Sequence, residues 1–255
     1  MNDVFEKVAE LRAQNCEFAF CIITNTRGSV PRTTGAKMLV FPDGKIYGTI
    51  GGGRIEKKVI EDALGVLKTK EPLLFHYDLL KQLQMSCGGS LDMYIEPVMR
   101  KNKLYIFGAG HTGSALAKRA LDFDFEITVI DNRKDYLEEL KLTGINKIFG
   151  EFSQVLAALP FDESTYITIV TYSHPFDREI LSFCINKPYA YLGMMGSQRK
   201  VELTKKMFIE DGIGTKEALE KVDMPLGIEI GADGPDEISI SILAKLLSVK
   251  NKITA

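Results

Sequence analysis

Apolar positions in the first hundred residues follow helical spacing in two segments and strand-like runs in the others. The pattern predicts helices over 4–13 and 54–69, and strands over 16–26, 36–41, 46–50, 72–79 and 91–99. The two shortest strands flank the segment Pro-Asp-Gly-Lys at 42–45, which favours a hairpin because Asp-Gly suits a tight turn. We therefore expect residues 1–100 to form a smaller domain of mixed α+β structure.

Beyond a charged connector at 100–103, apolar runs alternate regularly with amphipathic segments. Strands are predicted over 103–109, 126–132, 146–150, 165–172 and 188–196, and helices over 112–123, 134–140, 152–159, 177–186, 197–211 and 235–249. Strand–helix alternation favours right-handed crossovers and a doubly wound parallel sheet. We therefore expect residues 101–255 to form a Rossmann-like domain, which makes the chain an α/β protein.

The composition is that of an ordinary globular protein, with 255 residues, 45% hydrophobic and 26% charged. The formal net charge of -2 gives no electrostatic support for general nucleic-acid binding. No run is long and apolar enough to span a bilayer, and the charged, amphipathic first segment does not resemble a signal peptide. We therefore expect a cytoplasmic protein without a membrane segment.

Four cysteines are scattered along the chain and form no Cys-x-x-Cys pair, which argues against a disulfide framework and a four-cysteine zinc site. Cys16, Cys21 and Cys184 lie in apolar runs, which is typical of buried thiols. Cys87 differs because it stands among glycines in the segment MSCGGS.

Gly108, Gly110 and Gly113 form the pattern G-x-G-x-x-G between a predicted strand and a predicted helix, which indicates a dinucleotide-binding loop. Asp131 ends the next strand, where a carboxylate can accept hydrogen bonds from both ribose hydroxyls. That position favours an unphosphorylated ribose, although Arg133 nearby leaves a phosphorylated one open. The alternative is a strand–helix turn that needs its glycines only for packing.

Further polar residues follow the later strands of the same predicted sheet, where ligands of doubly wound sheets bind. His111 lies within the glycine loop and either faces a ligand or caps the turn. The others are His174, Asp177, Gly193, Gly196, Ser197, Gln198 and Arg199. Ser197 is predicted to cap a helix, where Arg199 binds an anion or simply lies in solvent.

His111, His174 and Asp177 are also candidates for a three-ligand metal site, although the sequence has no short ligand spacing. The same three residues, with Cys87, are the candidates for catalysis. No catalytic role follows for any of them from the sequence alone.

Three glycine-rich loops in the first half carry Arg27, Arg32 and Arg54: RGSVPRTTGAKM, GTIGGGRIE and SCGGSLDMYIEP. Gly53 and Arg54 stand at the start of a predicted helix, so their backbone, with Gly51 and Gly52 before it, forms a candidate anion cradle. The alternative is three glycine-rich turns of an antiparallel sheet.

These loops and the motifs YIFGAGHTGSALAKRA, VIDNR, YLGMMGSQRK and GIEIGADGPDEISISILAKL resemble, in order, those of the XdhC/CoxI proteins. Proteins of this family are accessory factors of xanthine dehydrogenase and related molybdenum hydroxylases. The resemblance implies an N-terminal XdhC/CoxI domain and a C-terminal Rossmann domain. It also implies a maturation factor, rather than an enzyme with its own turnover, that binds molybdenum cofactor (molybdopterin), supports its sulfuration and delivers it to a hydroxylase.

The matched motifs place the expected cofactor contacts at Arg32, Gly51, Gly52, Gly53, Arg54, Cys87, Gly88, Gly108, Gly110, His111, Gly113, Asp131, Gly193, Gly196, Ser197 and Arg199. Cys87 would contact molybdenum or a sulfur, because a soft metal centre favours thiolate. The chain departs from the family pattern at Val30, at Gln198 and over 234–236. The implied partners are a molybdenum hydroxylase, a cysteine desulfurase and a second copy of the chain.

Two other functions remain open. The glycine loop with Asp131 favours an NAD(P)-dependent oxidoreductase, or a domain that holds another nucleotide. The second of these functions is an assembly scaffold for the client enzyme. The sequence does not distinguish a scaffold from a protein that delivers the cofactor.

Overall fold

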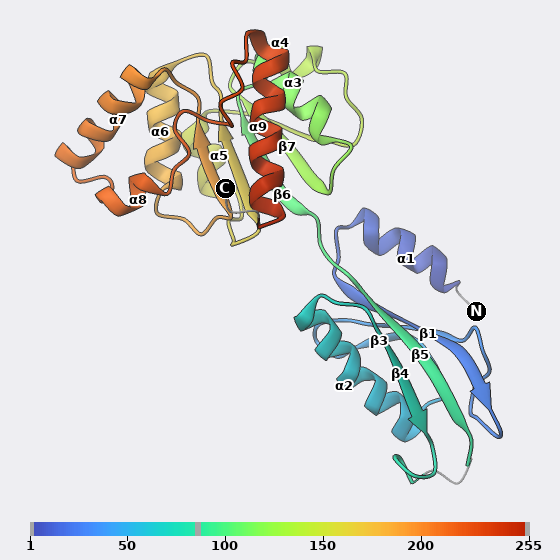
Figure 1. Cartoon of the computed structure of the whole chain (residues 1–255). Helices are drawn as coiled ribbons and strands as arrows, with labels where there is room; N and C mark the ends of the chain where they lie inside the picture. Colours follow the sequence, from blue (N-terminus) through green and yellow to red (C-terminus); the bar gives the residue numbers. More distant parts are fainter. Residues whose placement is uncertain (1–2, 85–87, 253–255) are drawn as a thin grey trace. The chain divides into compact units, whose positions relative to one another are not determined.

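The structure is a computed structural model that describes residues 3–84 and 88–252. Cys87 therefore lies outside the described residues, and its role stays a prediction. The chain folds as two compact units, Met1–Arg100 and Lys101–Ala255 (Figure 1). No helix in the described ranges has both the length and the apolar content needed to cross a membrane.

The first unit is an antiparallel sheet with one long helix on a face. Its elements are α1 (Val4–Ala13), β1 (Phe18–Arg27), β2 (Lys37–Val40), β3 (Ile46–Gly48), α2 (Gly53–Thr69), β4 (Leu73–Asp78) and β5 (Ser90–Val98). The strands pair in the order β3-β2-β1-β5-β4, and β2 and β3 form the predicted hairpin. The apolar stripe of α2, with Ile55, Val59 and Ala63, packs on the inward residues of β1, β2 and β5. The predicted mixed α+β fold is confirmed.

The second unit is a parallel sheet between two helical layers. Its elements are β6 (Asn102–Phe107), α3 (His111–Ala120), β7 (Phe125–Asp131), α4 (Lys134–Glu139), β8 (Asn146–Phe149), α5 (Phe152–Ala158), β9 (Thr165–Ile169), α6 (His174–Cys184), β10 (Tyr191–Met194), α7 (Gln198–Glu210), α8 (Lys216–Glu220) and α9 (Gly234–Lys250). The strands lie in the order β10-β9-β6-β7-β8. The chain adds β7 and β8 on one side of β6 and then β9 and β10 on its other side, so the strand order switches at β6. The predicted doubly wound parallel sheet is confirmed.

Side chains of β6 alternate between the two helical layers, as the two-residue period of a strand requires. Leu104 and Ile106 lie in a core with α3, α4 and α9, whereas Tyr105 and Phe107 lie in a core with α5, α6, α7 and α8. Both faces of the strand are therefore buried, which explains its almost continuously apolar sequence.

Two helices differ from the sequence prediction. α8 was not predicted, and α6 begins at His174 rather than at 177. Ser173 stands at the N-cap of α6 and Pro175 lies in the first turn, where its missing N–H costs no helical hydrogen bond.

The glycine loop after β6 packs so closely that two of its residues have no room for a side chain. Gly108 has φ +115°, and a Cβ there would lie 2.4 Å from Val170 O. A Cβ at Gly113 would lie 1.8 Å from Gly108 O, so α3 rests directly on the end of β6. These contacts are the close helix–strand approach for which the motif uses glycine.

We predict that Gly113→Ala lowers the free energy of unfolding of the second unit by about 2–3 kcal/mol, because the added methyl overlaps a backbone oxygen. Urea titration followed by circular dichroism measures this change. The matched control is Gly65→Ala in α2, where a Cβ would meet no atom within 4 Å. We expect the control to stabilise by about 0.5–1 kcal/mol, since alanine favours a helix over glycine. Equal effects of the two substitutions would contradict the packing argument.

Candidate functional site

Hydrogen bonds hold the glycine loop of the second unit at both of its ends. Gly108 N donates to Ile130 O at 2.8 Å, and Ser114 Oγ donates to Ala109 O at 2.8 Å. Ser114 N is the first in α3 to donate within the helix, to Gly110 O at 2.9 Å. The three N–H groups before it therefore have no acceptor inside the helix and carry a partial positive charge. An anionic group fits this end of α3.

Asp131 is fully buried at the end of β7, and both of its oxygens are occupied. Oδ2 accepts from Ala109 N at 2.7 Å and from Arg133 Nη2 at 2.8 Å. Oδ1 accepts from Arg133 N and from Arg133 Nε, each at 2.9 Å. Burial opposes the charge, but the bonds from Arg133 and Ala109 outweigh it and hold the pKa of Asp131 below its ordinary value.

The expectation that Asp131 would accept from ribose hydroxyls is not met in this arrangement. Each carboxylate oxygen already accepts two hydrogen bonds, which is its usual capacity. The carboxylate therefore binds its own loop and its own neighbour.

Arg133 is sandwiched between two tyrosine rings, which the sequence interpretation missed. Its Cζ lies 3.8 Å from the ring centroid of Tyr136 and 4.0 Å from that of Tyr172. The hydroxyl of Tyr172 also donates to Asn132 Oδ1 at 3.3 Å. Tyr136 is three residues away in the sequence and was visible as a neighbour, but Tyr172 comes from the loop after β9 and gave no local signal.

A histidine–carboxylate pair lies at the carboxyl end of β9. Asp177 is buried and its Oδ2 lies 3.1 Å from His174 Nδ1. Its Oδ1 accepts from Thr171 Oγ1 at 2.6 Å and from Thr171 N at 3.2 Å. Burial raises the pKa of Asp177, although bonds from Thr171 and the nearby His174 oppose that rise. The pair orients a partly exposed imidazole and leaves Nε2 on the far side of the ring, where it can accept or release a proton.

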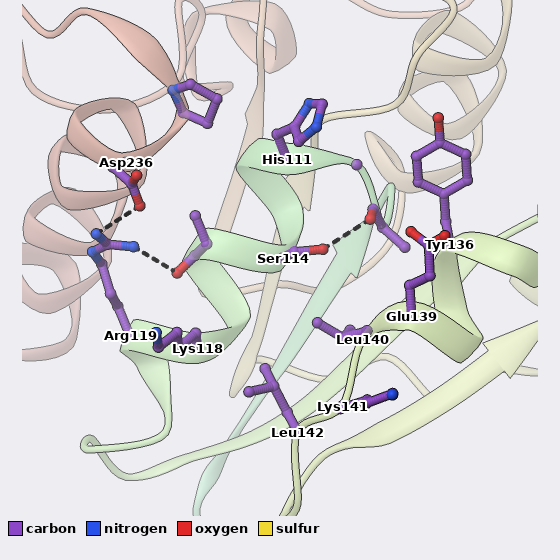
Figure 2. A pocket seen from close by; sticks show the side chains of 14 residues that line it. His111, Ser114, Lys118, Arg119, Tyr136, Glu139, Leu140, Lys141, Leu142 and Asp236 are labelled. Carbon is purple, nitrogen blue, oxygen red and sulfur yellow. Dashed lines mark hydrogen bonds and ion pairs between the residues drawn. The ribbon is translucent and has the colours of Figure 1, made fainter.

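A pocket of about 430 Å³ opens beside the glycine loop, between α3, α4 and the start of α9 (Figure 2). His111 is exposed at the first position of α3 and lies at the same end of the pocket as Tyr136 (Figure 2). An ion pair between Arg119 Nη2 and Asp236 Oδ1, at 2.9 Å, joins α3 to α9. The lining residues are Ala109, Gly110, His111, Ser114, Ala115, Lys118, Arg119, Tyr136, Glu139, Leu140, Lys141, Leu142, Pro235 and Asp236.

The three-ligand metal site considered for His111, His174 and Asp177 is not formed. Within 3–84 and 88–252, no three His, Cys, Asp or Glu side chains are grouped so that they could hold a metal ion. His174 and Asp177 do pair, but His111 belongs to the pocket beside α3.

The residues after β10 are only partly where the sequence placed them. Gly193 lies inside β10, paired with Thr168, and a Cβ there would lie 2.4 Å from Leu226 Cδ1. Its missing side chain therefore makes room for Leu226, which packs against the strand. Ser197 is the N-cap residue of α7, but its side chain makes no capping bond. Gly196 is half-buried and Arg199 is exposed at this helix start.

The three glycine-rich loops of the first unit meet at one end of its sheet. A Cβ at Gly51 would lie 2.4 Å from Pro31 Cβ, and one at Gly89 would lie 2.3 Å from Ser29 O. Arg54 Nη1 donates to Leu83 O at 3.1 Å and to Gln84 O at 3.4 Å. Arg54 thus holds the segment just before Cys87. Exposed residues of these loops include Arg27, Arg32, Gly51, Gly53, Arg54 and Gly88.

The anion cradle predicted at the triple glycine is occupied in part by the chain itself. Glu56 Oε2 accepts from Thr49 Oγ1 at 2.6 Å, from Gly52 N at 3.1 Å and from Ile50 N at 3.3 Å. An external anion would have to displace this carboxylate to use the same donors. Gly52 and Gly53 have φ +73° and +71°, and a Cβ on either would meet no atom within 4 Å. Their backbone is therefore open to a ligand even though Glu56 occupies part of the cradle.

Comparison with known proteins gives two matching family models. Residues 104–246 match the XdhC Rossmann domain, and residues 11–78 match the XdhC and CoxI family. The Escherichia coli (strain K12) protein named uncharacterized protein YqeB is 38% identical over 98% of this chain and 46% of that protein. A Bacillus subtilis (strain 168) protein named as a probable subunit of xanthine dehydrogenase is 26% identical over 64% of this chain and 47% of that protein. The chain spans about half the length of these curated relatives.

A crystal structure described as a xanthine dehydrogenase (BH1974) from Bacillus halodurans has the same fold. The TM-score is 0.54 at 21% identity, over 98% of this chain and 96% of that one. The likeness extends over both units.

We predict that Asp131→Asn lowers the free energy of unfolding by about 3 kcal/mol at neutral pH, because it removes the charge that pairs with Arg133. The pKa of Asp131 is lowered in the folded protein, so its contribution is present above the unfolded value of about 3.9 and is lost as the pH falls through the folded value. Urea titrations should therefore show a constant gap to wild type from about pH 7 to 5, and a shrinking gap below about pH 4.

The control for this prediction is Asp122→Asn, an exposed carboxylate of the same unit. We expect it to change stability by less than about 0.5 kcal/mol. A gap that does not depend on pH would show that Asp131 contributes packing rather than charge.

Proposed function

Because the chain belongs to the XdhC and CoxI family, we propose that it is an accessory protein of a xanthine dehydrogenase-like molybdenum hydroxylase. In this role it binds the molybdenum cofactor, a phosphorylated pterin, and supports its sulfuration and insertion. The name of the Bacillus subtilis relative supports a client of this class. A cysteine desulfurase as sulfur donor and a second copy of this chain complete the proposed assembly.

The meeting of the three loops in the first unit carries this proposal. It brings the exposed Arg27, Arg32 and Arg54 to the end of the sheet where the backbone of Gly52 and Gly53 is bare. A flat pterin can lie against backbone that has no side chain, and arginine pairs with phosphate through two N–H groups. The residues present therefore fit a phosphorylated pterin.

Arginine side chains, rather than loop N–H groups, are the proposed phosphate ligands. Glu56 already accepts from the N–H groups of Ile50 and Gly52. An anion that binds Arg32 and Arg54 therefore costs less free energy than one that must displace this carboxylate. When bound, the molybdenum cofactor supplies a soft metal centre, which favours a thiolate ligand. Cys87 is the proposed thiol, and Arg54 binds the carbonyl oxygens of Leu83 and Gln84 a few residues before it in the sequence.

We predict that native protein made in cells that synthesise the cofactor carries about one molybdopterin per chain. Mass spectrometry of the released small molecules and a molybdenum assay measure the load. Arg54→Gln should weaken binding roughly tenfold, since it removes one charge-assisted contact. Cys87→Ala should lower the activation of an added apo-hydroxylase.

The matched control is Arg12→Gln, which removes the same charge from an exposed position on α1. It should leave both cofactor load and hydroxylase activation unchanged. Normal binding and activation by Cys87→Ala would remove this thiol from the site, and protein without any pterin would overturn the cofactor role.

A second candidate function, an NAD(P)-dependent oxidoreductase, is favoured by the pair of His174 and Asp177. The imidazole lies at the start of α6, directly after the loop that follows β9, and is held by the buried carboxylate of Asp177 in the same helix. A Cβ on Gly108 would lie 3.0 Å from Thr171 Cα, so this loop packs against the glycine loop. A histidine in this place can exchange a proton with a carbonyl or alcohol while a nicotinamide exchanges hydride.

We predict for this candidate that His174→Gln lowers kcat with a small carbonyl substrate by roughly 10²- to 10⁴-fold and leaves nucleotide binding intact. Absorbance of the reduced nicotinamide reports turnover, and calorimetry reports binding. His76→Gln is the control, since His76 pairs with Asp92 at 2.6 Å on the surface of the other unit. Wild-type protein that turns over none of a panel of small carbonyl compounds would eliminate the candidate.

A further inference from the structure

The guanidinium of Arg133 is fixed in place on three sides. Asp131 accepts from its Nε and its Nη2, and the rings of Tyr136 and Tyr172 cover its two faces. A side chain held in this way loses little conformational entropy when it binds a ligand. The packing therefore prepares the guanidinium for binding before any ligand arrives.

One edge of this guanidinium is left for an external acceptor. A guanidinium has five N–H donors, and Asp131 uses one on Nε and one on Nη2. Nη1 has no hydrogen-bond acceptor among the residues that the structure describes. The side chain of Arg133 is 25% exposed, so its free edge is reached from solvent.

The free edge lies beside the glycine loop. A Cβ at Gly110 would come within 4.0 Å of Arg133 Nη2. In a doubly wound sheet this is where the ribose next to the loop-bound phosphates lies, at the end of the second strand. The group that meets a ribose here is a cation, because the carboxylate of Asp131 is buried and saturated.

The two tyrosine rings also shield the faces of the Arg133 guanidinium from water and leave its edge open. Tyr136 and Tyr172 are 40% and 53% exposed, so both rings reach from the guanidinium into solvent. Aromatic faces lower the local dielectric and strengthen a charge-assisted bond. They also offer flat surfaces to a nucleobase.

We propose that the second unit binds a dinucleotide whose adenosine ribose carries a phosphate, and that Arg133 selects for that phosphate. The phosphate monoester accepts hydrogen bonds from the free edge of Arg133, while Asp131 holds the opposite edge. Arg133 is thus a specificity-determining residue. This inference deepens the second candidate function, but it concerns binding alone and stands even where no turnover is found.

Calorimetric titration of the full chain with NADP⁺, NAD⁺ and inorganic phosphate tests the proposal. We expect NADP⁺ to bind tighter than NAD⁺ by roughly tenfold or more, because a bidentate charged contact is gained. Higher salt should narrow this difference. Arg133→Gln should reduce NADP⁺ affinity to that of NAD⁺, and the exposed Arg12→Gln should leave the preference unchanged.

A second variant covers the case in which Arg133→Gln fails to fold around the unpaired Asp131. Arg133→Lys keeps the positive charge but loses the planar edge, so it should fold and show a reduced preference for NADP⁺. NAD⁺ binding as tightly as NADP⁺ would overturn the proposal, and so would undetectable binding of both nucleotides. Inorganic phosphate that binds as tightly as NADP⁺ would also overturn it, by showing that the site takes free phosphate. A preference that persists in folded Arg133→Gln would remove Arg133 as its cause.

Discussion

A carboxylate without solvent contact must satisfy its charge with protein donors, and Asp131 does so with three groups of Arg133 and one N–H of the glycine loop. The same carboxylate therefore ties the end of β7 to the turn after β6. Because Ala109 N points at Asp131, the turn between Gly108 and Gly110 has a fixed path. These four hydrogen bonds therefore fix the position of α3, the pocket beside it and the free edge of Arg133.

Both units use an internal carboxylate to occupy backbone N–H groups before a helix. Glu56 does so at the triple glycine of the first unit, and Asp131 at the glycine loop of the second. Such loops are usually considered ready-made anion sites because their donors are free. Here arginine side chains reach solvent near each loop, so ligand anions are expected to meet guanidinium groups as well as the N–H groups that stay free.

Much of the fold followed from the sequence because its signals are local. Alternating and helical spacing located all ten strands and eight of the nine helices within 3–84 and 88–252. α8 escaped because its five residues are too few to show a period. The start of α6 was placed three residues late, because His174, Pro175 and Phe176 belong to a first turn in which proline is favoured and which shows no helical period of its own.

The candidate site was less predictable, because its decisive contacts join distant residues. The motifs correctly indicated the XdhC and CoxI family and the glycine loop. No pattern in the sequence predicts that Tyr172 covers Arg133, or that Glu56 accepts from the backbone N–H of Gly52 before α2. The predicted cofactor contacts and catalytic roles remain predictions, and those of Cys87 fall outside the described residues.

The hold of Arg54 on the carbonyls of Leu83 and Gln84 has a thermodynamic consequence. An anion that binds Arg54 through Nη1 competes with these two oxygens, so anion binding at that nitrogen and the hold on residues 83–84 draw on the same donor. By linkage, whatever stabilises the held segment weakens the anion site, and the anion loosens the segment by an equal free energy. In the proposed role, in which the protein gives up its ligand, such reciprocity is useful because each change at the segment alters how tightly the ligand is bound.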